Sequence, residues 1–322
     1  MFSPKSTATE VAKAFATQIR GKTILITGVS PGSLGSATAM AIASQQPQCL
    51  LLGSRTLKNI HSVIDDIHSM YPSTVVEPIL MDLSSQKSVR AAAADVNSRI
   101  SKLDVLINNA GIMAVPDRTL SEDGIEIQFA TNHLGHFLFT NLILKKLQAA
   151  AKDAKNEGDT RVINLSSNGH RISPVRFSDW NFENKTVPPE EQANEEAYKS
   201  RGQILEWSNG YEKLVAYGQS KTATIMTNLI RHMDLAKLQA STNSAPAGGN
   251  GPALKSLDQG AATSIFAAFD PSLNVESSIY LEDCHNGIAE AYASDPDLAA
   301  KLWKLSESIV GQSFSLKVES DA

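Results

Sequence analysis

The chain has 322 residues, 42% of them hydrophobic and 20% charged, which is enough for one large or two ordinary domains with a substantial core. The formal net charge of −5 argues against general affinity for nucleic acid or anionic membranes, since both need clustered Lys and Arg. Two cysteines, Cys49 and Cys284, exclude a disulfide framework and a cysteine-only metal site, and no apolar run is long enough to span a bilayer. We therefore expect a cytoplasmic protein without a membrane span or a metal site.

In the first half of the chain, short β-like runs alternate with helical stretches. After a short amphipathic helix at 8–19, we expect strands at 23–27, 49–53, 75–80, 103–107 and 161–165, separated by helices at 34–44, 57–70, 86–100 and 123–151. Strands that alternate with helices predict βαβ units with right-handed crossovers. The expected fold class is α/β: a doubly wound parallel sheet, or Rossmann fold, in one domain over residues 1–322.

The second half is less regular. Residues 168–210 carry scattered aromatic side chains and are interpreted as an insertion that forms a substrate lobe, with an inert surface loop as the alternative. Helices are expected at 211–238, 258–269 and 296–310, and a short strand at 278–281. Residues 240–257 are rich in Ser, Ala, Gly, Asn and Pro, which is typical of a flexible linker.

A glycine-rich turn, with Gly28, Gly32 and Gly35, follows the first predicted strand and precedes a helix. Glycines permit a tight turn and let a pyrophosphate approach the backbone, and the start of the helix offers free N–H groups. The turn therefore indicates a dinucleotide site, although a plain loop is the alternative.

Two further groups follow predicted strands. Arg55 stands just past the second strand, where an acid would bind a ribose 2′-hydroxyl and an Arg accommodates a 2′-phosphate, so the sequence favours NADP over NAD. A surface arginine is the alternative interpretation. Asp82 and the segment from Asn108 to Gly111 lie at strand carboxyl ends, where such sheets bind ligands.

Tyr217 and Lys221 are four residues apart, so they share one face of a predicted helix. A nearby ammonium favours the phenolate and lowers the pKa of the tyrosine, which makes it a general acid or base. Ser166 and Ser167, at the end of the fifth strand, offer hydroxyls to hold a carbonyl oxygen.

Taken together and in this order, these motifs resemble the short-chain dehydrogenase/reductase family over about residues 20–225, and more weakly over 257–314. Arg55 and the segment from Asn132 to Phe137 look most similar to the branch with retinol dehydrogenases and many fungal oxidoreductases. The resemblance implies that Tyr217 donates or accepts the proton and that Lys221 lowers the tyrosine's pKa and binds the nicotinamide ribose. It also implies that Ser167 orients the substrate oxygen and that Asn132 holds a water linking Lys221 to solvent. The implied contacts to NADP (NADPH) are Gly28, Ser30, Gly32, Leu34, Gly35, Arg55, Asp82, Asn109, Tyr217 and Lys221.

The sequence departs from the family at three places. The glycine-rich turn has one residue more between Gly32 and Gly35 than the usual family pattern, which we interpret as a variant turn. Fifty residues separate Ser167 from Tyr217, far more than is usual, and this extra length is the insertion at 168–210. Between Lys221 and Asp258 we find no run typical of the family's sixth strand, which leaves open a missing strand or a replacement by the long helix.

Two functions follow. The first is an NADP-dependent oxidoreductase that interconverts a carbonyl and an alcohol on an apolar or bulky small molecule, with a homo-oligomer left open. The second is a catalytically impaired or truncated family member that acts as a nucleotide-binding scaffold.

Overall fold

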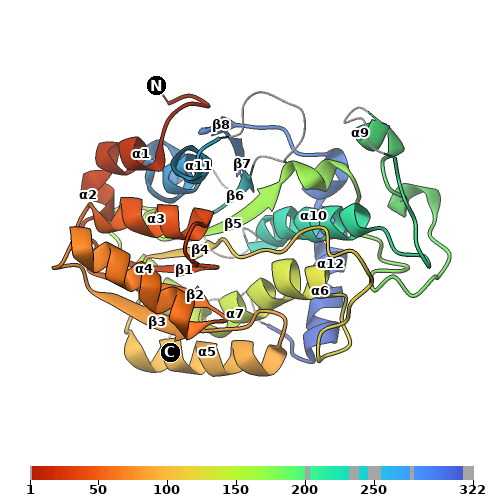
Figure 1. Cartoon of the computed structure of the whole chain (residues 1–322), viewed down its shortest axis with the longest axis horizontal. Helices are drawn as coiled ribbons and strands as arrows, with labels where there is room; N and C mark the ends of the chain where they lie inside the picture. Colours follow the sequence, from red (N-terminus) through yellow and green to blue (C-terminus); the bar gives the residue numbers. More distant parts are fainter. Residues whose placement is uncertain (1, 200–203, 232–238, 246–254, 276–278, 315–322) are drawn as a thin grey trace.

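The computed structural model describes residues 2–199, 204–231, 239–245, 255–275 and 279–314 (Figure 1). Within these residues the strands form a single sheet in the order β3-β2-β1-β4-β5-β6-β7-β8. Every neighbouring pair is parallel except β7 and β8. The strands are β1 (Thr23–Thr27), β2 (Cys49–Ser54), β3 (Val76–Leu80), β4 (Val105–Asn108), β5 (Arg161–Ser167), β6 (Gln239–Ala245), β7 (Ile279–Glu282) and β8 (His285–Asn286). The predicted doubly wound parallel sheet is confirmed, and its strand order reverses between β1 and β4.

Helices cover both faces of the sheet (Figure 1). One face carries α1 (Ala8–Ala14), α2 (Ala16–Ile19), α3 (Leu34–Ala43), α4 (Leu57–Met70) and α11 (Leu257–Phe269). The other carries α5 (Gln86–Arg99), α6 (Ile127–Phe129), α7 (Gly135–Leu142), α8 (Leu144–Asp153), α10 (Lys213–Arg231) and α12 (Pro296–Val310). Along β1, Ile24 and Ile26 pack into the first face and Leu25 into the second, so the strand is apolar on both sides.

The strand β6 corrects the sequence analysis, which found no sixth strand and placed a flexible linker at 240–257. Residues 239–245 pair in parallel with β5 along their whole length and with β7 at three positions. The prediction failed because these residues are small and polar, with neither an apolar run nor strict alternation. Residues 246–254 of the expected linker lie outside the described residues. Ser256, at its end, caps α11 by accepting a hydrogen bond from the backbone N–H of Gln259.

The long helix expected at 123–151 is broken into α6, a π-helical turn at Ala130–Leu134, α7 and α8. A π-turn inserts an extra residue into the helix and re-aims the side chains around it. This turn places Asn132 at the carboxyl edge of the sheet. The helix expected at 211–238 is α10, and residues 232–238 lie outside the described part of the chain.

Candidate active site

A cavity of about 400 Å³ lies at the carboxyl ends of β1, β2, β3 and β4, where the strand order reverses. Ligands of open α/β sheets bind at this place. Six of the predicted cofactor residues line the cavity, namely Gly28, Ser30, Leu34, Arg55, Asp82 and Asn109. Gly32, Gly35, Tyr217 and Lys221 lie outside its lining.

The turn between β1 and α3 has room only for glycine at two places. A Cβ on Gly28 would lie 2.5 Å from the Cα of Ala110, and one on Gly35 would lie 2.6 Å from the carbonyl oxygen of Gly28. Ser33 caps α3, because its hydroxyl accepts a hydrogen bond from the backbone N–H of Ser36 at 3.1 Å. The start of α3 borders the cavity through Ser33 and Leu34, and it directs the positive end of the helix dipole there.

Arg55 is exposed at the cavity rim, directly after β2, and no carboxylate accompanies it there. It makes no ion pair with any residue in the described part of the chain. Asp82 follows β3, and one of its carboxylate oxygens accepts hydrogen bonds from the backbone N–H and the hydroxyl of Ser84. The rim thus offers a free guanidinium on one strand and an anchored carboxylate on the next.

Ser167 and Tyr217 meet at the end of β5. The Ser167 hydroxyl hydrogen-bonds to the phenol of Tyr217 and accepts from the backbone N–H of Gly169 at 3.1 Å. A Cβ on Gly169 would lie 2.6 Å from the Tyr217 ring, so the turn after β5 packs directly against the phenol. Lys221 lies one helical turn farther along α10, with its Nζ 5.8 Å from the centre of the Tyr217 ring and donating to the carbonyl of Leu165 at 2.9 Å.

Burial governs the pKa values of both groups. It raises the pKa of Tyr217, and the hydrogen bond from Ser167 offsets this shift in part. It lowers the pKa of Lys221 to about 8. The sequence analysis expected the pKa of Tyr217 to be lowered, whereas it is raised. Desolvation of the phenol dominates, because the ammonium of Lys221 is hydrogen-bonded to the carbonyl of Leu165 and not to the phenol.

Asn132 joins the π-turn to the strand end after β4. Its amide donates to the carbonyl of Ile112 and to the hydroxyl of Ser220, both at 2.9 Å, and its oxygen accepts from the N–H of Ile112 at 2.8 Å. Gly111 lies between Asn132 and Lys221, since a Cβ there would be 3.3 Å from the first side chain and 3.1 Å from the second. The four predicted catalytic residues therefore lie on three neighbouring elements: Tyr217 and Lys221 on α10, Ser167 at the end of β5, and Asn132 on the π-turn. The sequence analysis missed Ser220, whose only signal was its place between Tyr217 and Lys221.

The insertion wraps around the amino-terminal half of α10. Its Ile172, Phe182 and Tyr198 form a small apolar core together with Tyr211, Val215 and Ala216, the last two of which belong to α10. Two buried carboxylates tie it to neighbouring helices. Glu212 accepts from the first N–H groups of α10 and from the hydroxyl of Tyr198, and Glu126 caps α6 and accepts from the hydroxyl of Tyr211 at 3.0 Å.

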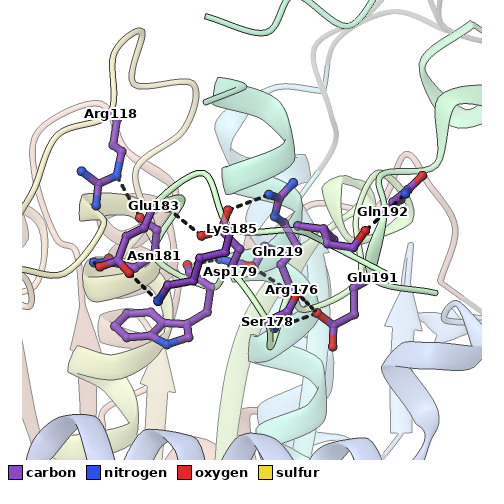
Figure 2. A network of polar contacts seen from close by, with 12 residues as sticks. Arg118, Arg176, Ser178, Asp179, Asn181, Glu183, Lys185, Glu191, Gln192 and Gln219 are labelled. Carbon is purple, nitrogen blue, oxygen red and sulfur yellow. Dashed lines mark hydrogen bonds and ion pairs between the residues drawn. The ribbon is translucent and has the colours of Figure 1, made fainter. Parts of the chain in front are cut away.

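Figure 2 shows a polar network through which the insertion holds α10. The side chain of Gln219 accepts from the N–H of Arg176 at 3.0 Å and donates to the carbonyl of Trp180 at 2.9 Å. Arg176 is buried, pairs with Asp179 at 3.0 Å, and stacks on the ring of Phe182 at 4.6 Å. Gln219 is two residues from both Tyr217 and Lys221, so it points to the opposite side of the helix. This part of the insertion therefore contacts α10 on the side opposite Tyr217 and Lys221.

Among the described residues, no helix is long and apolar enough to cross a membrane, and no three potential metal-binding side chains gather in one place.

Known proteins with similar sequences and structures are consistent with this geometry. The family model for short chain dehydrogenases matches residues 22–178. An "Oxidoreductase fscI" from Fusarium equiseti is 41% identical over 70% of this chain and 86% of its own. Human "Retinol dehydrogenase 13" is 30% identical over 91% of this chain and 86% of its own. The solved structure of an uncharacterized protein from Mycobacterium paratuberculosis aligns with a TM-score of 0.70 and 26% identity, over 92% of this chain and 96% of that one. The chain is therefore an oxidoreductase that belongs to the short-chain dehydrogenase/reductase family.

Proposed function

We propose that the protein is an NADP-dependent oxidoreductase that interconverts a carbonyl and an alcohol on an apolar or bulky small molecule. The observation that carries this proposal is the hydrogen bond between Ser167 and Tyr217, with Lys221 one helical turn away and the strand-end cavity beside them. A phenol and a serine hydroxyl that meet at one point can hold and protonate the same carbonyl oxygen.

The residues around the cavity fit a dinucleotide with a 2′-phosphate. Gly28 and Gly35 leave room where side chains would otherwise fill the turn, and the start of α3 is suited to a pyrophosphate. Arg55 is exposed at the rim, with no acid beside it that would favour a free ribose hydroxyl. When bound, a nicotinamide cofactor supplies or accepts a hydride at the substrate carbon.

The residues of this chain handle the oxygen and the proton. Its raised pKa keeps Tyr217 a protonated phenol at neutral pH, so it is ready to donate to a carbonyl oxygen that is being reduced. When a substrate is bound, the single hydrogen of the Ser167 hydroxyl turns from the phenol to that oxygen and donates a second hydrogen bond to it. Lys221 has a pKa of about 8 and is largely charged at pH 7, so it favours the phenolate that remains after proton transfer. In the oxidative direction the same phenolate accepts the proton of the alcohol.

We assign residues 168–210 as the substrate lobe. Its first turn, Asn168–Arg171, packs against the phenol through Gly169. The same insertion carries exposed apolar side chains, Ile204 and Trp207, which favour an apolar substrate. The human relative is named for retinol, an apolar alcohol, and this also supports the assignment. A cytoplasmic location belongs to the same proposal.

The main argument for the second candidate function, a nucleotide-binding scaffold, no longer holds. It was motivated by the apparent lack of a sixth strand beside β5, and β6 occupies that position. We therefore keep the oxidoreductase as the one proposed function.

The Tyr217→Phe variant tests it. We expect NADPH-dependent reduction of a panel of apolar ketones and aldehydes to fall at least about 100-fold, because a positioned general acid contributes about 10²–10⁴-fold. NADPH affinity should stay within about threefold, since the phenol lies outside the cavity lining. Tyr71→Phe, at the end of α4, is the control and should keep full activity. Turnover retained in Tyr217→Phe would remove this residue from the mechanism.

A further inference from the structure

His136 lies buried between the two halves of the site. It belongs to the first turn of α7, and its side chain bridges two residues that are far apart in sequence. Its Nε2 is 2.8 Å from the hydroxyl of Thr27, the last residue of β1. Its Nδ1 is 3.2 Å from the main-chain carbonyl of Asn132.

Chemistry fixes the direction of each hydrogen bond in this bridge. A carbonyl oxygen only accepts, so Nδ1 must carry the hydrogen that is shared with Asn132. Burial, with the nearby charge of Lys221, lowers the pKa of His136 to about 4, so the ring is neutral and Nε2 has a free lone pair. Thr27 therefore donates its hydroxyl hydrogen to Nε2. The same hydroxyl accepts from the backbone N–H of Ala110 at 3.1 Å.

These bonds form one continuous chain across the site. It runs from the strand end after β4, through Thr27 before the Gly28 turn, to the π-turn that carries Asn132. The side chain of Asn132 in turn holds Ser220, the neighbour of Lys221. A shift at the Gly28 turn is therefore resisted by the same imidazole that fixes Asn132.

We propose that His136, as the neutral Nδ1–H tautomer, is a positioning residue. It connects the glycine-rich turn after β1 to Asn132 and so keeps the reacting groups at the right distance from one another. This inference rests on the proposed oxidoreductase function. His136 does not itself line the cavity, so it acts through Thr27, which does, and through Asn132.

The His136→Leu variant breaks both bonds. We expect kcat for carbonyl reduction to fall about tenfold, since a misplacement of about 1 Å can cost up to about 100-fold. KM for the carbonyl should change less than about threefold, because no substrate contact is removed. His136→Gln restores most of kcat, because an amide oxygen can accept from Thr27 in place of Nε2.

His133 provides a matched control. It is buried one turn earlier and hydrogen-bonds to Ser306 and Thr227, away from Thr27. His133→Leu should lower the melting temperature but leave kcat within about twofold, since its partners lie outside the site. An equal loss of kcat in both leucine variants would reduce His136 to a packing residue and overturn the proposal.

A double-mutant cycle with Thr27→Val tests whether His136 acts through the Thr27 hydroxyl. If His136 acts through the Thr27 hydroxyl, the double variant should be no slower than the slower single variant. Losses that multiply would show that the two residues act independently and would contradict the proposal.

Nitrogen NMR of histidine-labelled protein separates this inference from the proposed function. We expect a neutral His136 with its hydrogen on Nδ1, and a changed Nε2 shift in Thr27→Val. A hydrogen on Nε2, or a charged ring at pH 7, would overturn the inference whether or not the protein turns over a carbonyl. Absence of turnover in the wild-type protein would instead contradict the proposed function.

Discussion

Alanine variants at three glycines of the β1–α3 turn can distinguish the effect of backbone strain from that of steric contact. Gly28 has a φ of +73°, and a Cβ there would lie 2.5 Å from the Cα of Ala110. Gly32 has a φ of +68° but nothing within 4 Å of a Cβ. Gly35 has no positive φ, but a Cβ would lie 2.6 Å from the carbonyl oxygen of Gly28. Alanine therefore introduces both backbone strain and a steric clash at Gly28, strain alone at Gly32, and a clash alone at Gly35.

The expected losses in the free energy of unfolding follow from this geometry. An alanine in the left-handed region costs roughly 1–2 kcal/mol, which is the whole effect at Gly32. At Gly28 a carbon–carbon distance near 2.5 Å must open by about 1 Å to reach normal contact. Overpacking of this kind adds about 1–3 kcal/mol, so Gly28→Ala should lose about 2–5 kcal/mol in total.

The same displacement pushes Ala110 and Asn109 out of the cavity wall. We expect Gly28→Ala to weaken NADPH binding more than about tenfold, which corresponds to about 1.4 kcal/mol, while Gly32→Ala changes it less than about threefold. Urea unfolding gives the first quantity and fluorescence titration the second. Equal effects of Gly28→Ala and Gly32→Ala in both assays would refute the steric argument.

Three further predictions concern buried polar groups. The pKa of Lys221 is lowered from about 10.4 in the unfolded chain to about 8, so the free energy of unfolding should rise with pH between these values. Lys221→Met should abolish this rise in urea titrations at pH 8 to 10. Asp179→Asn leaves Arg176 buried without its countercharge and should cost about 3–5 kcal/mol by calorimetry, whereas the paired apolar replacement Arg176→Met with Asp179→Leu should recover most of it. Gln219→Leu removes two hydrogen bonds behind the catalytic helix and should lower kcat about tenfold without raising the KM for NADPH, as steady-state kinetics would show.

Most of the fold was predictable, because its strands have strong local signals. The apolar runs that became β1 and β2 are buried on both faces, and the Gly28 turn lies between a strand and a helix as expected. Several candidate site residues come together because strand ends of a parallel sheet converge at one edge. Arg55 and Asn109 therefore reached the same cavity although they are far apart in sequence.

The remainder depends on contacts that no local pattern encodes. The strand β6 has no apolar run, and it is recognised only through its pairing with β5 and β7. The raised pKa of Tyr217 reflects burial by the turn at Gly169, which the spacing of Tyr217 and Lys221 does not reveal. The link between His136 and Thr27 has no sequence signal, since it joins positions that are distant in sequence.

The most direct test of the central claim is a titration of the purified protein with NADPH and NADH, in the wild type and in Arg55→Ala. We expect NADPH to bind at least about tenfold more tightly than NADH, because Arg55 would form a charge-assisted contact with the 2′-phosphate. Arg55→Ala should remove this preference and leave NADH affinity nearly unchanged. Binding of neither nucleotide, or a preference for NADPH that survives in Arg55→Ala, would contradict the account.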